Sequence, residues 1–210
     1  SAIMAQRYEI VDLDLQNRFP LGGRQEIIWG GGYRLISDHI DGSFTASMEP
    51  PRRTVEVESL FVQDDITAVE NRLHLVIGSK FEWNDYTGYA VQPNARLLWT
   101  PDARQTAWAS ISRAVRTPSR SDANAVLRQV VIPPGDPANP GPIPVIPTVK
   151  GSPAFVSEDL IAYEAGYRTK IGDHAAVDIA SFYNVYTDLR TMEPGAPTTI
   201  LGPAPYVELP

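Results

Sequence analysis

Hydrophobic and polar residues alternate along several long stretches of the chain. Between Val11 and Phe19 the odd positions are mostly apolar, whereas the even positions carry two aspartates, a glutamine and an arginine. A period of two is that of a β-strand with one apolar and one polar face. The same alternation, bounded by turn-forming residues, predicts eight strands, at residues 7–19, 25–37, 55–67, 72–84, 90–100, 105–116, 159–170 and 175–188.

The lengths of these strands and of their connections favour a membrane protein. Strands of soluble proteins average about 5–6 residues, whereas a tilted strand needs about 9–11 residues to cross a bilayer, and most of these exceed ten. Every second connection is tight, as when one end of a barrel faces the periplasm and the other carries extracellular loops. The tight turns are Pro20–Arg24, Glu70–Asn71, Pro101–Arg104 and Ile171–His174, and the long connections are 38–54, 117–158 and the tail after Leu189.

The alternation therefore predicts an all-β fold, an antiparallel transmembrane β-barrel meander of about eight strands in sequence order. Apolar positions should face lipid and polar positions the lumen, and a register slip of one residue would reverse every assignment. We treat Asp64 as a further lumen position, paired with an inward arginine. The expected outward set is Leu13, Trp29, Leu75, Leu97, Tyr163 and Ile179, and the expected lumen-facing polar wall is Asp14, Glu82, Arg96, Glu164, Arg168 and Asp178.

Two other features refine this picture. The proline-rich segment Val130–Val149 should be an extended or mobile surface loop, because proline lacks the backbone donor that a central strand needs. Aromatic residues near strand ends suggest girdles at the two membrane interfaces. These aromatic residues are Tyr8, Phe19, Trp83, Tyr86, Trp99, Trp108 and Tyr186.

Composition excludes several classes of function. The net charge of −7 argues against nucleic-acid binding, which needs a basic footprint, and the absence of cysteine excludes a thiolate site. The chain contains no common catalytic motif, and its three histidines, His39, His74 and His174, are scattered. We therefore expect no enzyme activity, no cofactor and no metal site. Alternation also occurs in other β-proteins, so a complete eight-stranded structural barrel and a soluble β-sandwich binding module remain alternatives.

Several motifs in this order resemble the barrel of TonB-dependent outer-membrane receptors. The segment FVQDDI at Phe61–Ile66, followed by Leu73–Phe81, is similar to a strand pair of that family. One departure is Val115, which stands where the family usually has phenylalanine. Further resemblances lie in Gln92–Pro101, Ala109–Ser119, Ser157–Arg168 and Ala180–Leu189.

The resemblance implies a location and a set of partners. It implies that residues 1–210 are part of one barrel domain of the 22-stranded type, from its C-terminal half, in the outer membrane of a Gram-negative bacterium. The plug domain, the TonB box and the C-terminal strands would lie outside this chain, as would a signal peptide, since the first residues do not resemble one. The function implied is TonB-dependent uptake of a scarce nutrient, most often an iron-siderophore complex. The partners would be outer-membrane lipid, the ligand, and TonB acting through the plug.

Loop arginines are the candidate ligand contacts. Guanidinium groups suit anionic ligands such as a ferric siderophore, and loops on a rigid scaffold commonly carry recognition. The long loop at about 117–158 should contribute to capture, and deletion of Val131–Val149 is expected to weaken binding without touching any strand. The candidate arginines are Arg52, Arg53, Arg116, Arg120 and Arg128.

Overall fold

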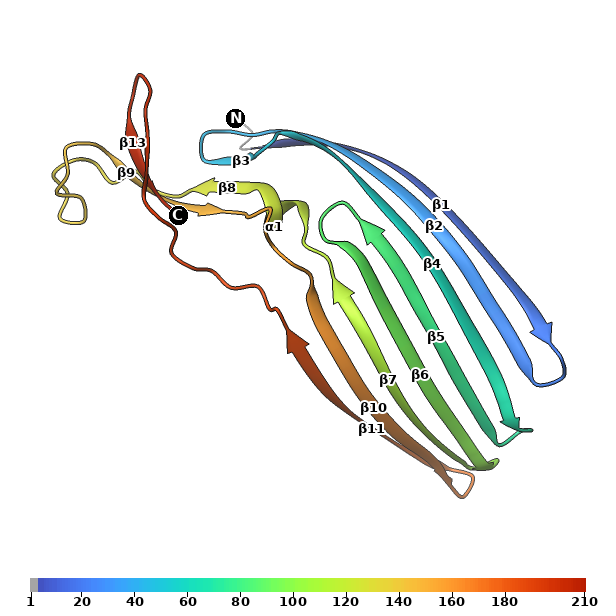
Figure 1. Cartoon of the computed structure of the whole chain (residues 1–210). Coiled ribbons are helices and arrows are strands. Elements are labelled where there is room, and N and C mark those ends of the chain that lie inside the picture. The colour runs from blue at the N-terminus through green and yellow to red at the C-terminus, as the bar shows by residue number, and fades with distance from the viewer. Residues whose placement is uncertain (1–3) are drawn as a thin grey trace.

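The computed structural model describes residues 4–210 and consists mainly of one antiparallel sheet of eight long strands (Figure 1). The strands follow the chain order in space, β1-β2-β4-β5-β6-β7-β10-β11. All eight predicted strands and the predicted meander are confirmed. Their bounds are β1 Ala5–Leu21, β2 Gln25–Asp41, β4 Arg52–Val69, β5 Leu73–Asn84, β6 Gly88–Asp102, β7 Gln105–Arg116, β10 Glu158–Ile171 and β11 Ala175–Thr187.

The four tight turns join the strands at one end of the sheet, as the sequence predicts. They comprise residues 22–24, 70–72, 103–104 and 172–174. Asn71 has φ of 56° and Gly172 has φ of 63°, a left-handed conformation that glycine adopts freely and asparagine tolerates. The turn chemistry therefore agrees with the strand pattern that flanks it.

The stagger of the strands gives their tilt. The row that begins at Leu21, the last residue of β1, passes directly across all eight strands to Ser181. At that point β11 still has six residues to run to its first residue, Ala175. Six residues of about 3.3 Å over seven inter-strand spacings of about 4.8 Å correspond to a tilt of about 30°. This value is close to the 35–45° or so of transmembrane barrels.

The sheet is a single open layer. The accessible surface is 13924 Å², whereas a compact monomer of 23.1 kDa would expose about 9,700 Å². The edge strands are β1 and β11, so among the described residues the eight strands do not close into a barrel. Both observations contradict the alternatives: a sandwich would bury one face of each sheet, and a complete eight-stranded barrel would pair its edges.

A second, smaller sheet forms at the end of the long strands opposite the tight turns (Figure 1). Its order is β12-β13-β9-β8-β3, and the five-residue helix α1 precedes β8. Among residues 4–210 no helix is long and apolar enough to cross a membrane. The bounds are β3 Ala46–Met48, α1 Arg120–Asn124, β8 Ala125–Arg128, β9 Val145–Lys150, β12 Thr198–Ile200 and β13 Tyr206–Leu209.

The prediction that Val130–Val149 contains no central strand is wrong for its last residues. β9 lies between β8 and β13, and it includes Pro147. The missing donor is tolerated because Pro147 lies opposite Gln129, one residue beyond the end of β8, and its carbonyl still accepts a hydrogen bond of 3.0 Å from the N–H of Gln129. Deletion of Val131–Val149 would therefore remove most of a strand, contrary to the expectation above.

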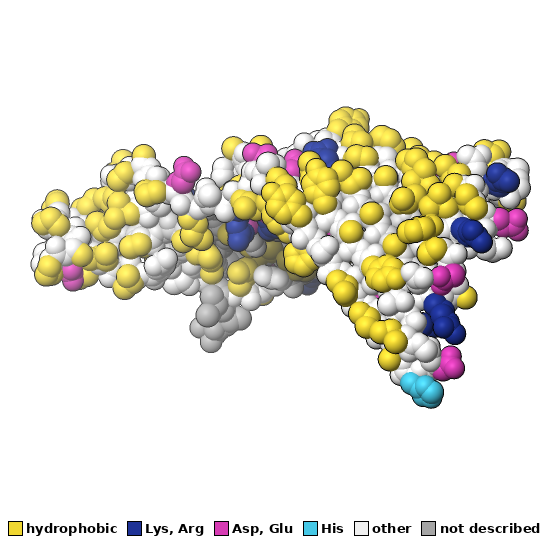
Figure 2. Space-filling view, turned by 90° about the horizontal axis from the view of Figure 1, so that it is seen from below, with side chains coloured by type: hydrophobic (Ala, Val, Ile, Leu, Met, Phe, Trp, Pro, Cys, Tyr) yellow, Lys and Arg dark blue, Asp and Glu magenta, His cyan; other side chains and the backbone are white. Residues whose placement is uncertain are grey.

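The strand registers separate two faces, because directly paired residues share a face. All six residues of the expected outward set lie on one face, which we call the apolar face, and all six of the expected lumen set lie on the other, the polar face. Leu13 and Ile179 on the apolar face are 63% and 62% exposed. Hydrophobic side chains cover much of the surface seen from the turn end in Figure 2, and charged ones gather along one margin.

Two interpretations of the sequence are wrong, wholly or in part, about the face of the sheet on which residues lie. Asp64 pairs with Ile27 and Ile77 and so lies on the apolar face, where its carboxylate accepts a hydrogen bond from Gln25 at 3.0 Å. Its neighbour Asp65 occupies the polar face instead. The aromatic set is also divided: Phe19, Trp83 and Trp99 lie on the apolar face, Tyr8, Trp108 and Tyr186 on the polar face, and Tyr86 in a loop.

Candidate ligand-binding site

The loops of the chain pack against the polar face of the sheet. Apart from Gly30, the buried residues of the eight long strands lie near the loop end, and all of them, Gly30 included, are on the polar face. The loops therefore cover the mouth of the side that would enclose the lumen. The buried residues other than Gly30 are Asp38, Ile40, Val55, Asn84 and Ala90.

Two arginines fasten α1 to this mouth. Nε of Arg120 lies 2.8 Å from the Asp38 carboxylate of β2, and the side chains are only 12% and 4% exposed. Arg53 of β4 donates a hydrogen bond of 2.9 Å to the side-chain oxygen of Asn124, and its guanidinium lies 4.2 Å from the centre of the Tyr86 ring. Burial raises the pKa of Tyr86, and Arg53 and Arg120 oppose that rise. Arg53 and Arg120 therefore hold α1 and the loops beside it on the polar face of the sheet.

Arg128 performs a similar role in the small sheet. It lies 2.9 Å from Glu208 of β13, whose side chain is 1% exposed and also pairs with Lys150 of β9. Burial alone would raise the pKa of Glu208, but hydrogen bonds from Lys150 and Arg128 outweigh it and lower the pKa below its ordinary value. The guanidinium also lies 5.2 Å from the Phe44 ring. These contacts join β8, β9, β13 and the segment before β3.

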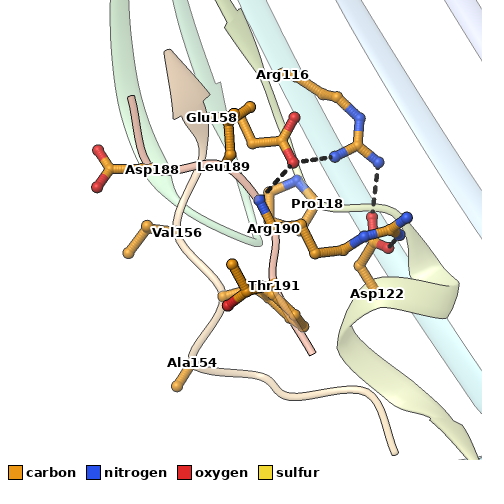
Figure 3. Close-up of a pocket in the computed structure, with 11 residues that line it drawn as sticks. Arg116, Pro118, Asp122, Ala154, Val156, Glu158, Asp188, Leu189, Arg190 and Thr191 are labelled. Carbon is orange, nitrogen blue, oxygen red and sulfur yellow. Dashed lines mark hydrogen bonds and ion pairs between the residues drawn. The ribbon is translucent and has the colours of Figure 1, made fainter. Parts of the chain in front are cut away.

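Arg116 lines a pocket of about 250 Å³ between the end of β7, α1, the segment before β10 and the tail after β11 (Figure 3). Its guanidinium bridges two carboxylates, at 2.9 Å from Glu158 and 3.1 Å from Asp122. Arg190 enters from the tail and pairs with the other oxygen of Asp122. Pro118, Phe155 and Leu189 supply apolar walls. The pocket therefore combines a four-membered charge cluster with a hydrophobic surface.

Asp122 is the centre of this cluster. Its carboxylate accepts a hydrogen bond from the backbone N–H of Ser119 at 2.9 Å, and the Ser119 side chain caps α1 in return. Burial would raise the pKa of Asp122, but hydrogen bonds from Ser119 and Arg190 outweigh it and lower the pKa from 3.8 to about 2. The side chain is 4% exposed, whereas Arg116 and Arg190 are about half exposed. Asp122 is therefore a charged anchor between barrel, helix and tail.

The five arginines predicted from the sequence do not form one site. Arg116 lines the pocket, Arg53 and Arg120 hold α1, and Arg128 lies in the small sheet. Arg52 is exposed and pairs in register with His39 on the apolar face, opposite the face that the loops cover. The sequence analysis missed Arg190, which follows the last long strand and has no motif that marks it. Only the folded tail brings it to Asp122.

The polar wall forms pairs both along and across strands. Lys80 lies 2.6 Å from Glu82 on the same strand, β5, and Arg168 of β10 lies 3.5 Å from Asp178 of β11. Ser110 donates a hydrogen bond of 3.1 Å to Glu164. Such pairs stabilise neighbouring strands and make the surface hydrophilic. Asp14 of β1 lies beside Gly32 of β2, which in turn pairs with Ser59 of β4.

Small residues on the polar face are covered by large neighbours. Gly166 pairs directly with Trp108, and the indole lies so close that a Cβ at Gly166 would collide with it. The guanidinium of Arg96 also lies over this indole, 5.2 Å from the centre of the Trp108 ring. Gly30 is covered in the same way by Phe61.

Within residues 4–210 no group of three or more His, Asp or Glu side chains is placed to hold a metal ion.

Comparisons with known proteins show which family and which solved structures this chain is similar to. Residues 3–206 match the family model for the TonB dependent receptor-like β-barrel. A search of curated proteins found no match. The fold is similar to the siderophore receptor PirA from Acinetobacter baumannii, with a TM-score of 0.69 and 13% identity over 97% of this chain and 32% of that one.

Two receptors from Pseudomonas aeruginosa are similar to the same degree. A mutant of the ferric enterobactin receptor PfeA has a TM-score of 0.71 and 18% identity over 97% of this chain and 31% of its own. The siderophore receptor PirA has a TM-score of 0.66 and 17% identity, over 98% and 37%. The chain thus spans about a third of the length of these structures, and at such identities the likeness concerns the fold. With the family match across nearly the whole sequence, the chain belongs to the TonB-dependent receptor β-barrel family.

Proposed function

We propose that this chain forms part of the wall and outer mouth of a receptor that takes up a scarce nutrient across the outer membrane of a Gram-negative bacterium. In this proposal residues 1–210 belong to one barrel domain, and a plug domain outside the chain couples uptake to TonB. The ligand is an anionic chelate of the ferric siderophore class. The similar structures are those of siderophore and ferric enterobactin receptors, which supports this class.

The observation that carries the proposal is the placement of the loops. A sheet with one apolar and one polar face is what a barrel between lipid and a water-filled lumen requires. Every buried residue of the long strands lies on the polar face, so the loops close over that side rather than over the apolar one. Folded loops at the mouth of a lumen are positioned to contact a ligand before the ligand enters the lumen.

The pocket at Arg116 and Arg190 is the proposed contact site among the described residues. Its two guanidiniums are half exposed, and its apolar walls suit the organic shell of a chelate. An anionic ligand would replace Glu158 as a partner of Arg116. Arg53, Arg120 and Arg128 would position the loops, and the polar wall would surround the plug.

The test uses the complete receptor that contains this chain. A strain lacking the receptor should lose uptake of iron-55 from at least one ferric siderophore of a tested panel, and removal of TonB should abolish the same uptake. In the restored receptor, Arg116→Ala with Arg190→Ala should lower the affinity at least tenfold, while Arg104→Ala at a tight turn serves as the control. Unchanged uptake of every siderophore in the deletion strain would refute the proposal.

The proline-rich loop needs a narrower deletion than the sequence suggested. Removal of Pro134–Gly141 spares β9 and the bridge between Ile132 and Val145. If the loop tip contributes to capture, this deletion should weaken ligand binding while the receptor still inserts. Unchanged affinity would leave the tip as a passive insertion.

A further inference from the structure

The ladder between β6 and β7 ends before the strands themselves end. Toward the loop end their last direct pair is Asn94 with Ser112, although β6 extends to Gly88 and β7 to Arg116. At the same end, the other neighbours in the large sheet stay paired until one of the two strands stops. The part of the wall described by residues 4–210 therefore has one seam, between Gly88–Pro93 of β6 and Arg113–Arg116 of β7.

Pro93 explains why the ladder ends at this point. The guanidinium of Arg113 donates a hydrogen bond of 2.7 Å to the carbonyl of Val91, so that carbonyl points toward β7. Residues two apart along a strand direct their backbone groups to the same side, and the N–H that Pro93 lacks would therefore also face β7. Continued by one residue, the register places Arg113 opposite Pro93. A side chain thus serves a carbonyl that has no ladder partner on β7.

Farther toward the loops, side chains alone join the β5–β6 hairpin to β7 and β10. The amide of Asn84 donates a hydrogen bond of 3.4 Å to the hydroxyl of Thr117, and the hydroxyl of Ser157 donates one of 2.8 Å to that of Thr87. Among residues 4–210, each direct hydrogen bond between these two parts above the last ladder pair involves a side chain. A seam held in this way opens more readily than a continuous ladder.

The helix α1 links the two sides of the seam. On the side of β6, the contacts of Arg120 and Asn124 described above fasten the helix to β2 and β4. On the side of β7, Asp122 pairs with Arg116 at the end of that strand and with Arg190 of the tail. Strands β5 and β6 lie between these anchors, so α1 bridges the hairpin (Figure 1). The anchors on β2 and β4 are largely buried, whereas Arg116 and Arg190 are half exposed, so the link to β7 is the one that can be released.

We propose that the wall opens between β6 and β7 at the loop end and that α1 keeps this seam closed. Release of Arg116 and Arg190 from Asp122 frees β7, β10 and the tail to move away from β6, while the ladder below the seam acts as the hinge. The loop at 117–158 moves with them, since its two ends are continuous with β7 and β10. That a ligand causes the release rests on the proposed function, but the seam and its link through α1 do not.

Distances between spin labels in the complete receptor, kept free of other cysteines and of ligand, measure the opening. The chain itself has no cysteine, so labels on introduced cysteines report single positions. Labels at Tyr89 and Val185 lie on opposite sides of the seam. Labels at Tyr89 and Leu13 are the control pair, because the two residues lie on one register row through the continuous ladder from β6 to β1. All three side chains are exposed.

Breaking the link should lengthen only the distance across the seam. Arg116→Ala with Arg190→Ala, and separately Asp122→Asn, should add a population that is longer by at least one strand spacing, about 5 Å. The control distance should not change. Pro93→Val restores the missing N–H and should suppress the long population when it is combined with Asp122→Asn.

Matched controls make each result decisive. Arg24→Ala with Arg72→Ala, at the tight turns, removes two charges far from the seam and should leave both distances as in the wild type. Only receptor that migrates as folded in unheated gels is compared. A seam distance that stays at the wild-type value in both variants of the link would overturn the proposal, as would equal lengthening of the control pair or lengthening that persists with Pro93→Val. Because no ligand is added, a failed uptake experiment leaves these distances interpretable.

Discussion

Substitution of Asp122 by asparagine should loosen α1 and the pocket at the mouth of the barrel. Asparagine keeps the size of the side chain and can still accept the hydrogen bond from Ser119, but it removes the charge that Arg116 and Arg190 share. A pKa lowered from 3.8 to about 2 corresponds to about 2.4 kcal/mol at about 1.36 kcal/mol per unit. Since both arginines are half exposed and screened by water, we expect about 1–2 kcal/mol.

The sign of the pH dependence follows from the lowered pKa. The stabilisation is fully present above about pH 5 and is lost as the pH falls from about 4 through about 2, because the carboxylate must then be protonated in the folded loop. In the asparagine variant this pH dependence should be absent. The loss at neutral pH should speed the opening of residues 117–128 about 5- to 30-fold.

Hydrogen exchange of the complete receptor, corrected for the intrinsic effect of pH, measures this opening. Peptides that cover residues 117–128 should exchange faster in the Asp122→Asn variant, while peptides from the long strands should not change. Asp173→Asn, at an exposed turn, is the control substitution. Equal protection of residues 117–128 in wild type and variant at pH 7 would refute the reasoning, because the ion pairs would then contribute nothing to the fold of the mouth.

Three shorter predictions concern the wall and the small sheet. Gly166→Val should destabilise the barrel by about 1–3 kcal/mol, because its Cβ would collide with the indole that covers the glycine, whereas Gly23→Ala, in open space, should leave the unfolding temperature unchanged. Glu208→Gln should cost about 3 kcal/mol in the small sheet and increase its cleavage by protease, and the wild-type sheet should lose the same protection as the pH falls below about 4.5. A spin label at Ile179 should be quenched by a lipid-soluble reagent and a label at Asp178 by a water-soluble one. Equal quenching at both positions would contradict the assignment of faces.

The wall could be predicted from the sequence because its information is local. Each long strand repeats its period of two over 12 to 18 residues, and each tight turn carries residues suited to it. Because side chains alternate between the two faces along each strand and directly paired residues share a face, one apolar row is enough to assign every position to a face. Asp64 was misassigned although Val62 and Ile66, two residues away on either side, share its face. The neighbours at two-residue spacing were the available signal.

The small sheet could not be predicted for the opposite reason. Its strands have three to six residues, and β3 and β13 are separated by more than 150 positions of the chain. Strands this short carry no measurable period, and Pro147 argues against the strand that occupies the centre. The pairing of β9 with β13 depends on the buried Glu208 between Arg128 and Lys150. Such a contact is visible only after the tail has folded back onto the long loop.

Residue type alone does not tell which loop arginines can accept a ligand, and the reason bears on how a ligand could bind. A guanidinium buried against a carboxylate must lose that partner before it can accept an anion, and breaking such a pair leaves an uncompensated buried charge. Arg120 and Arg128 are 12% and 14% exposed, so this exchange would be costly for them. At Arg116 and Arg190 water already reaches half of each side chain, and Glu158, the partner that Arg116 would release, is 19% exposed. Partner exchange is therefore least costly in the pocket that these two arginines line.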